Sequence, residues 1–210
     1  MELFIENNAV VLFQGDSVTD AEHNREDDSD LGRGYAMITA AWFSALYPGK
    51  AVRFLNRGIG GDRVRDLQER WKRDCLPIAP TWVSILIGVN DTWRRFDSNE
   101  ITTPQEFEAS YRAILEDTVR FTEARLILCE PFLLPVLDGQ ADWRSDLDPK
   151  IEITRQLARE FGTICLPLDD IFTQAAKLRP AVFWLRDGVH PTAAGHALIA
   201  QNWLKAVGAL

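Results

Sequence analysis

The residues of this chain best suited to do chemistry are a serine near its start and an aspartate and a histidine near its end. Ser17 follows Gly15 and Asp16 directly after an apolar run, and a tight turn there would expose its hydroxyl. Asp187 precedes His190 by three residues, a spacing that lets both side chains reach the same side of one turn. If the three side chains meet, His190 can take the proton of Ser17 while Asp187 holds the imidazole in the useful tautomer. The set predicts acyl transfer through a serine nucleophile.

Acyl transfer also needs hydrogen-bond donors for the negative charge that develops on the carbonyl oxygen. The candidates are the backbone N–H groups of Ser17 and Gly61 and the side-chain amide of Asn90. A glycine at position 61 suits this role, because a side chain would crowd the acyl carbonyl. Losing one such donor typically costs about 2.7–4 kcal/mol of transition-state stabilisation.

Each of these features is common on its own. A Gly-Asp-Ser turn usually only caps the helix that follows, and Asp-x-x-His before a proline is more often a helix cap than part of a catalytic set. A metal site built from Asp187, His190 and His196 would leave the serine and the oxyanion donors unexplained. The joint occurrence of the Gly-Asp-Ser turn, the oxyanion donors and Asp-x-x-His therefore favours a serine hydrolase. We predict no metal or other cofactor.

Four further polar residues have simpler explanations. His196 shares a helical face with Trp203 and other apolar residues, so we expect a core histidine with a satisfied hydrogen bond. His23 lies in an acidic segment and is expected to be solvated. Asp16 and Asp91 are expected to organise turns through backbone hydrogen bonds rather than to transfer protons.

Apolar runs alternate with amphipathic segments along the chain. Strands are predicted at residues 9–13, 52–55, 82–87, 126–129 and 163–168. Helices are predicted at residues 35–46, from a cap at Asp62 through Trp71, and at 104–122, 151–161, 169–178 and 191–207. The alternation indicates an α/β fold with a five-stranded parallel, flavodoxin-like sheet in the order 2-1-3-4-5.

In such a sheet the site lies beyond the carboxyl ends of the strands. The segments leaving the first three predicted strands contain Ser17, Gly61 and Asn90, so all three should meet at one edge. Trp93 comes three residues after Asn90 and is predicted to line the substrate site. The stretch 131–149 is long for a structureless connection and is predicted to form a wall or lid there, with Phe132 and Trp143 as further wall candidates.

Composition and charge limit the classes of protein and partner. The chain has 210 residues, 46% hydrophobic and 26% charged, which suits one globular domain spanning residues 1–210. A net charge of −8 argues against a nucleic-acid partner, since phosphate backbones repel an acidic surface. No stretch approaches the roughly 18 apolar residues of a membrane-spanning helix.

The N-terminal segment and the cysteines point to a cytoplasmic protein. The first residues lack the basic region and the apolar run of a secretion signal. Cys75, Cys129 and Cys165 are widely spaced and form no CxxC pair, so neither a zinc site nor a redox motif is predicted. Reduced thiols fit that location.

The segments that carry the candidate residues resemble the four sequence blocks of the SGNH (GDSL-type) hydrolases. The matching residues are Gly15-Asp16-Ser17, Gly61, Asn90 and Asp187-x-x-His190. The resemblance implies a three-layer αβα fold and the chemistry of serine esterases, lipases and acyl hydrolases. It implies that Ser17 is the nucleophile, His190 the base and Asp187 its partner, with Ser17, Gly61 and Asn90 as the oxyanion hole.

Longer strings are similar to the intracellular bacterial acetyl xylan esterases within this family. They are residues 56–61, 64–67, 82–85 and 88–94. This similarity implies a small acetylated-sugar substrate, such as acetylated xylo-oligosaccharides, and assembly into a homo-oligomer. Those enzymes tend to have an aromatic residue directly before the catalytic aspartate, whereas this chain has Arg186 there. Trp184 could supply the aromatic group, so Trp184 and Arg186 are both candidate substrate-binding residues.

Two other interpretations stay open. One is a lipolytic acyl hydrolase of the same family, acting on short-chain lipids, lysophospholipids or thioesters. The other is a non-catalytic flavodoxin-like or carbohydrate-binding protein, although the first loop lacks a phosphate cradle for FMN and a binding module would not need a serine, aspartate and histidine set.

Overall fold

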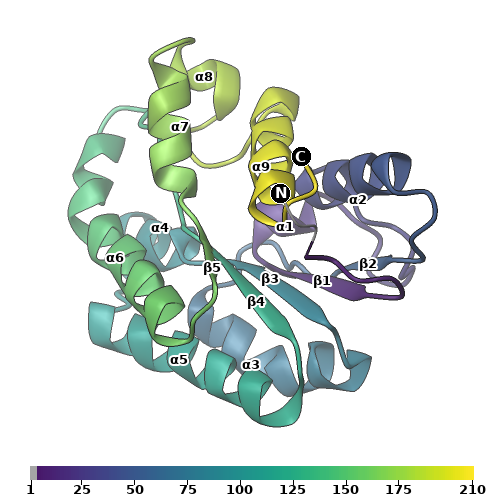
Figure 1. The fold of residues 1–210 in the computed structure, drawn as a ribbon. Helices are drawn as coiled ribbons and strands as arrows, with labels where there is room; N and C mark the ends of the chain where they lie inside the picture. Colours follow the sequence, from purple (N-terminus) through teal and green to yellow (C-terminus); the bar gives the residue numbers. More distant parts are fainter. Residues whose placement is uncertain (1–3) are drawn as a thin grey trace.

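A computed structural model describes residues 4–210, and its centre is a parallel sheet of five strands (Figure 1). The strands are β1 (Val10–Gly15), β2 (Arg53–Asn56), β3 (Trp82–Leu86), β4 (Arg125–Cys129) and β5 (Ile164–Leu166). Their order is β2-β1-β3-β4-β5, which confirms the predicted topology. Most residues of the strands are apolar, as expected of a sheet that helices cover on both faces.

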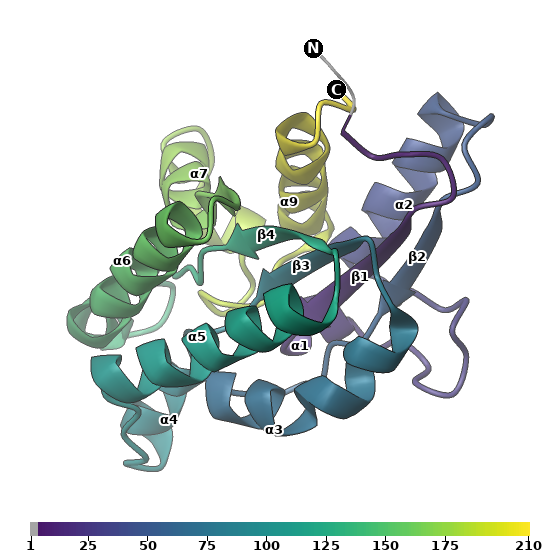
Figure 2. The ribbon, with the colours of Figure 1, turned by 60° about the horizontal axis from the view of Figure 1, so that its bottom comes forward.

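The helices lie in two layers. They are α1 (Ser17–Asp20), α2 (Tyr35–Leu46), α3 (Val64–Asp74), α4 (Val89–Asp97), α5 (Pro104–Phe121), α6 (Arg144–Glu160), α7 (Leu168–Ala176), α8 (Ala181–Trp184) and α9 (Ala193–Ala206), with short 3-10 helices at Leu76–Ile78 and Gln140–Trp143. Helices α3, α5 and α6 cover one face of the sheet, and α2, α7 and α9 cover the other (Figures 1 and 2).

Each face of the sheet has its own apolar core. Trp71 of α3 and Tyr111 of α5 are fully buried on one side, and Phe43 of α2 and Trp203 of α9 are buried on the other. The core positions predicted for Trp71 and Trp203 are confirmed. The Trp203 indole donates to Ser84, a buried hydroxyl within β3, so the second layer is also fixed by a polar contact.

The stretch 131–149 is not a long irregular loop, and this prediction was wrong. Helix α6 begins at Arg144, before Pro149, and a 3-10 helix precedes it. The first turns of α6 are held by a separate apolar cluster that contains Leu147 and Ile151 as well as Val89 and Val189. This packing keeps the chain helical through the proline, although Pro149 has no N–H to donate.

The start of α3 also differs from the prediction. Its N-cap is Arg63, and the Asp62 carboxylate instead accepts a hydrogen bond from Arg70 at 2.7 Å. The N–H of Val64 is satisfied by Asp91 at 3.0 Å. A carboxylate from the first turn of α4 therefore does what a local cap was expected to do.

The two ends of the described chain meet at one end of the molecule. The N–H of Phe4 donates to the carbonyl of Val207 at 3.1 Å, directly after α9 (Figure 2). Among residues 4–210, no helix is both long and apolar enough to cross a membrane.

Candidate active site

The carboxyl ends of the strands bring together the segments predicted to meet. Ser17 begins α1 directly after β1, and Asn90 lies in the first turn of α4, after β3. Gly61 lies in the connection from β2 to α3. A Cβ built on the adjacent Gly60 would be 3.8 Å from the Ser17 Cβ, so this turn lies beside the serine.

Ser17, His190 and Asp187 form a continuous hydrogen-bonded chain. The Ser17 Oγ is 2.9 Å from His190 Nε2, and His190 Nδ1 is 2.7 Å from Asp187 Oδ2. Because the ionised carboxylate can only accept, the imidazole carries its proton on Nδ1 and offers Nε2 as an acceptor to the serine. The arrangement can deprotonate the hydroxyl as it attacks a carbonyl carbon.

Asp187 is fixed by its own turn. Its Oδ1 accepts the backbone N–H groups of Val189 at 3.1 Å and His190 at 2.8 Å. Partial burial alone would raise the pKa of this carboxyl, but the hydrogen bonds from His190 and Val189 lower it below its ordinary value. Asp187 therefore stays ionised and orients the imidazole.

A buried glutamine holds the loop of Asp187 from behind. Gln140 is 2% exposed; its Oε1 accepts from Val136 and Leu137, and its Nε2 donates to the Asp187 carbonyl at 2.6 Å. Gly188 has a φ of +90°, and a Cβ there would be 2.5 Å from Gln140 Oε1. Sequence analysis did not identify Gln140, because its partner is 47 residues away.

The candidate oxyanion donors are tied to one another. Gly61 has a φ of +89°, a conformation that favours glycine independently of any crowding of the substrate. One N–H of the Asn90 amide donates to the carbonyl of Asp62 at 3.1 Å, which leaves its second N–H available. The contact between Asp91 and Val64 joins the same two segments, so two hydrogen bonds tie α4 to the chain that follows Gly61.

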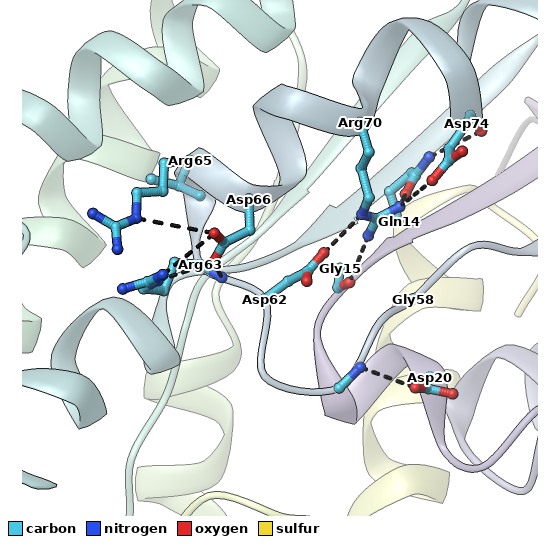
Figure 3. A network of polar contacts seen from close by, with 12 residues as sticks. Gln14, Gly15, Asp20, Gly58, Asp62, Arg63, Arg65, Asp66, Arg70 and Asp74 are labelled. Atoms are coloured by element: carbon cyan, nitrogen blue, oxygen red, sulfur yellow. Dashed lines mark hydrogen bonds and ion pairs between the residues drawn. The ribbon is translucent and has the colours of Figure 1, made fainter. Parts of the chain in front are cut away.

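A buried arginine links the Gly61 turn to the strand that precedes Ser17 (Figure 3). Arg70 is 7% exposed; it donates to Asp62 at 2.7 Å, to Gln14 Oε1 at 2.9 Å and to the Gly15 carbonyl at 3.1 Å. Its fourth acceptor is Asp74 at 3.3 Å. Sequence analysis missed this residue, although Arg70 lies at helical spacing from Leu67 on the buried face of α3.

Asp16 and Asp91 organise turns, as predicted. Asp16 Oδ1 accepts the N–H of Val18 at 3.0 Å and caps α1, and Asp91 binds the N–H of Val64. Burial raises the pKa of each carboxyl to about 7. The charge of Asp91 adds to the rise at Asp16, whereas the charge of Lys150 opposes the rise at Asp91.

The other two histidines differ from one another. His196 is buried, and its Nδ1 accepts the N–H of Tyr35 at 3.1 Å, which confirms a core histidine with a satisfied bond. Burial lowers the pKa of His196 to about 4. His23 is also buried, 2.9 Å from Asp20, so the expectation of a solvated side chain was wrong. Asp20 holds this segment in place, because it also binds Arg25 and the N–H of Gly60.

A cavity of about 460 Å³ opens beside Ser17 and His190. Arg186 and His196 contribute to its wall. Trp184 does not, because its indole turns to the carbonyl of Ala175 at 3.0 Å. The remaining lining residues are Val18, Asp20, Ala21, Glu22, Arg33 and Pro191.

An aromatic group lies on the other side of His190. The Trp93 ring is 5.7 Å from the His190 ring, and Trp143 packs against Trp93 at 5.4 Å. Phe132, by contrast, is buried against Phe172 and lies behind the site rather than in its wall. Trp93 thus lies beside His190 but is not one of the residues that line the cavity, and its part in the substrate site stays a prediction.

Comparison with known proteins identifies the same family that the sequence motifs resemble. The sequence profile of the GDSL-like lipase/acylhydrolase family matches residues 13–198. An acetylxylan esterase of Geobacillus stearothermophilus is 34% identical over 208 residues, covering 94% of this chain and 93% of that protein.

Solved structures agree with the sequence relatives. The crystal structure of Axe2, an acetylxylan esterase from Geobacillus stearothermophilus, has a TM-score of 0.91 at 31% identity and covers 98% of this chain and 97% of its own. A protein from Parabacteroides merdae described as a GDSL-like lipase has a TM-score of 0.95 at 35% identity, and the match covers 100% of both chains. The chain therefore belongs to the GDSL-like lipase/acylhydrolase family, has the SGNH hydrolase fold and is an esterase of that family.

Proposed function

We propose that this esterase removes acetyl groups from sugars, with acetylated xylo-oligosaccharides as the first substrates to test, through an acyl-enzyme formed on Ser17. The 2.9 Å contact between Ser17 and His190, extended to Asp187, is the observation that supports the mechanism best. Among the structures that resemble this chain are catalytic mutants of Axe2 in which a serine or a histidine is replaced by alanine.

The reaction takes two steps. Ser17 Oγ attacks the ester carbonyl while His190 Nε2 accepts its proton, and the oxyanion is held by the N–H groups of Ser17 and Gly61 and the free N–H of Asn90. As the ester C–O bond breaks, His190 gives the proton to the departing sugar oxygen, which leaves as a hydroxyl, and an acetyl-serine remains. A water molecule activated by His190 hydrolyses this intermediate and releases acetate.

The character of the cavity favours a short acyl group and a polar alcohol. Four of its lining side chains are charged, and its apolar lining residues are Val18, Ala21 and Pro191. A second hollow, behind Val18, is apolar but only about 10 Å³ in volume, which leaves no room for a fatty acyl chain. Trp93 offers an aromatic face to a sugar ring next to His190.

The test is a comparison of substrates with matched serine variants. The wild-type protein should release acetate from acetylated xylo-oligosaccharides, and Ser17→Ala should lose this activity by several orders of magnitude. Ser44→Ala, an exposed serine of α2, is the control and should keep full activity. A preference for acyl chains of about eight carbons or more would favour the lipolytic alternative, and activity retained in Ser17→Ala would contradict the mechanism.

Assembly into a homo-oligomer and a cytoplasmic location belong to the same proposal. The exposed apolar side chains of Leu178, Val182 and Phe183, at the end of α7 and in α8, offer a surface for contacts between copies. Light scattering on the purified protein tests the oligomer, and fractionation of the producing cell tests the location.

A further inference from the structure

Of the four charged side chains that line the cavity, three have a partner of opposite charge and one does not. The carboxylate of Asp20 binds Arg25 at 2.6 Å and the N–H of Gly60 at 2.9 Å, and Glu22 pairs with Arg33 at 3.0 Å. Arg186 also lines the cavity, yet no Asp or Glu among residues 4–210 lies within ion-pair distance of its guanidinium. It is the one lining cation of the described chain without an acidic partner.

A second donor lies in the same wall. His196 is 7% exposed and lines the cavity. Its Nδ1 accepts the Tyr35 N–H, so the neutral ring carries its proton on Nε2. No acceptor for this N–H is found within residues 4–210. Arg186 and His196 line the same cavity. Burial, together with the nearby charge of Arg186, lowers the pKa of His196 to about 4, so the ring is neutral near pH 7.

The position of this wall indicates which half of the substrate it faces. Arg186 and His190 belong to one short loop, in which the Arg186 N–H donates to the His190 carbonyl at 2.8 Å. His190 must reach the leaving alcohol to return the proton, so the alcohol lies on its side of the reacting carbon. The candidate oxyanion donors come instead from Ser17 itself and from the segments after β2 and β3, so the acyl oxygen is expected on that side.

We propose that Arg186 and His196 form a carboxylate-binding subsite for the alcohol half of the ester, so that the preferred substrates are acetylated acidic sugars, such as uronosyl residues. The inference rests on the proposed sugar acetylesterase function. A guanidinium takes a carboxylate through two parallel hydrogen bonds, and a neutral N–H donor beside it adds a third. Because the chain carries a net charge of −8, its overall field repels such substrates, and the preference must come from this local cation.

The experiment compares two matched esters, monoacetylated methyl glucuronoside and monoacetylated methyl glucoside. The wild-type protein should have the higher kcat/KM on the glucuronoside. The ratio of the two kcat/KM values should fall roughly fivefold in Arg186→Met, the size expected of one partly exposed ion pair. Arg120→Met removes an equal charge at the far end of α5 and should leave the ratio unchanged. His196→Asn keeps an acceptor for Tyr35 and loses the Nε2 donor, so it should lower the ratio less.

Binding without turnover separates this inference from the proposed function. In the Ser17→Ala background, methyl glucuronoside should bind more tightly than methyl glucoside, and adding Arg186→Met should remove the difference. Equal ratios in the wild-type protein and Arg186→Met, or equal binding of the two glycosides, would overturn the subsite. A preference confined to a carboxylate on the acyl side, seen with 4-nitrophenyl hemisuccinate against 4-nitrophenyl acetate, would also overturn it. Hydrolysis of neither sugar ester would contradict the proposed function, while the binding comparison would still decide the subsite.

Discussion

At the scale of single residues, the two ends of the His190 ring are held differently. Nδ1 faces a carboxylate that its own turn keeps ionised, whereas Nε2 faces the hydroxyl of Ser17, which is 173 positions away in sequence. The first contact is local and could be inferred from the spacing of Asp187 and His190. The second depends on the whole sheet, and the sequence could only suggest it.

Acidification should reduce activity through His190 rather than through Asp187. The pKa of Asp187 is already lowered, so this carboxyl keeps its charge in mild acid. A histidine, by contrast, acts as a general base only in its unprotonated form. A profile of kcat/KM against pH should therefore show one acid limb. Asp187→Asn should lower activity at every pH, since the ring loses the acceptor that fixes its tautomer. A profile that stays flat into acid would contradict the role of His190.

Asn90 should contribute to turnover more than to binding. The charge that its free N–H meets develops only in the transition state, so Asn90→Ala should lower kcat by roughly 100- to 1,000-fold with little change in KM. Asn202→Ala removes an amide that bonds only within α9 and serves as the control. A rise in KM at unchanged kcat would show that Asn90 binds the substrate in its ground state instead.

At the scale of elements, the strands and their order followed from the sequence because short apolar runs separated by amphipathic segments leave few arrangements. Helix α4 is absent from the helices predicted from the sequence, which places Asn90 only in the segment that leaves the third strand. That segment opens a helix directly after Gly88, whose φ is +127°. The supports of the site, Arg70 and Gln140, were missed because the contacts that tie them to the site, with Gly15 and Asp187, are with residues more than 40 positions away.

Arg70 should couple stability to catalysis. It joins the end of β1, the Gly61 turn and the end of α3, so Arg70→Met leaves several buried acceptors unpaired and should cost about 3–5 kcal/mol of unfolding free energy. Arg70→Lys should retain part of this stability but fail to hold all four acceptors, and its kcat should fall while KM changes little.

Arg73→Met is the matched control for Arg70. Its guanidinium is exposed and, among residues 4–210, binds only Asp74, so the loss should stay below about 1 kcal/mol. Denaturant unfolding measures the loss of stability. The rate of inactivation by a phosphonate, which mimics the tetrahedral intermediate, measures the loss of catalysis. Full kcat in folded Arg70→Lys would show that the network supports the fold alone.

At the scale of the whole molecule, the buried carboxyls predict an unusual dependence of stability on pH. The pKa of Asp91 is about 7 in the folded protein, above the ordinary value of 3.8, so the folded state binds this proton more strongly than the unfolded chain does. Its contribution to stability is therefore present in acid and is lost as the pH rises from about 4 to about 7. Asp16 should act in the same direction.

Asp91→Asn tests this behaviour. The amide oxygen can still accept the Val64 N–H, while the ionisation is removed, so the variant should gain stability relative to the wild-type protein as the pH is raised through this range. Asp138→Asn, an exposed aspartate, should show no such trend. Urea unfolding at a series of pH values measures both, and parallel curves for Asp91→Asn and the wild-type protein would refute the prediction.

The hydrogen bond between Phe4 and Val207 holds the two ends of the described chain together, so the backbone forms a nearly closed ring. Gly49 lies in an exposed turn, and no atom lies within 4 Å of the position that a Cβ would take there. None of the site residues lies in this turn. A circularly permuted chain that starts after Gly49 and joins the old ends through a short linker would place Asp187 and His190 before Ser17 in the gene. Their positions in space would not change. The order of serine, aspartate and histidine along the sequence thus depends on where the chain starts. The catalytic geometry depends on the fold, which the permutation would leave unchanged.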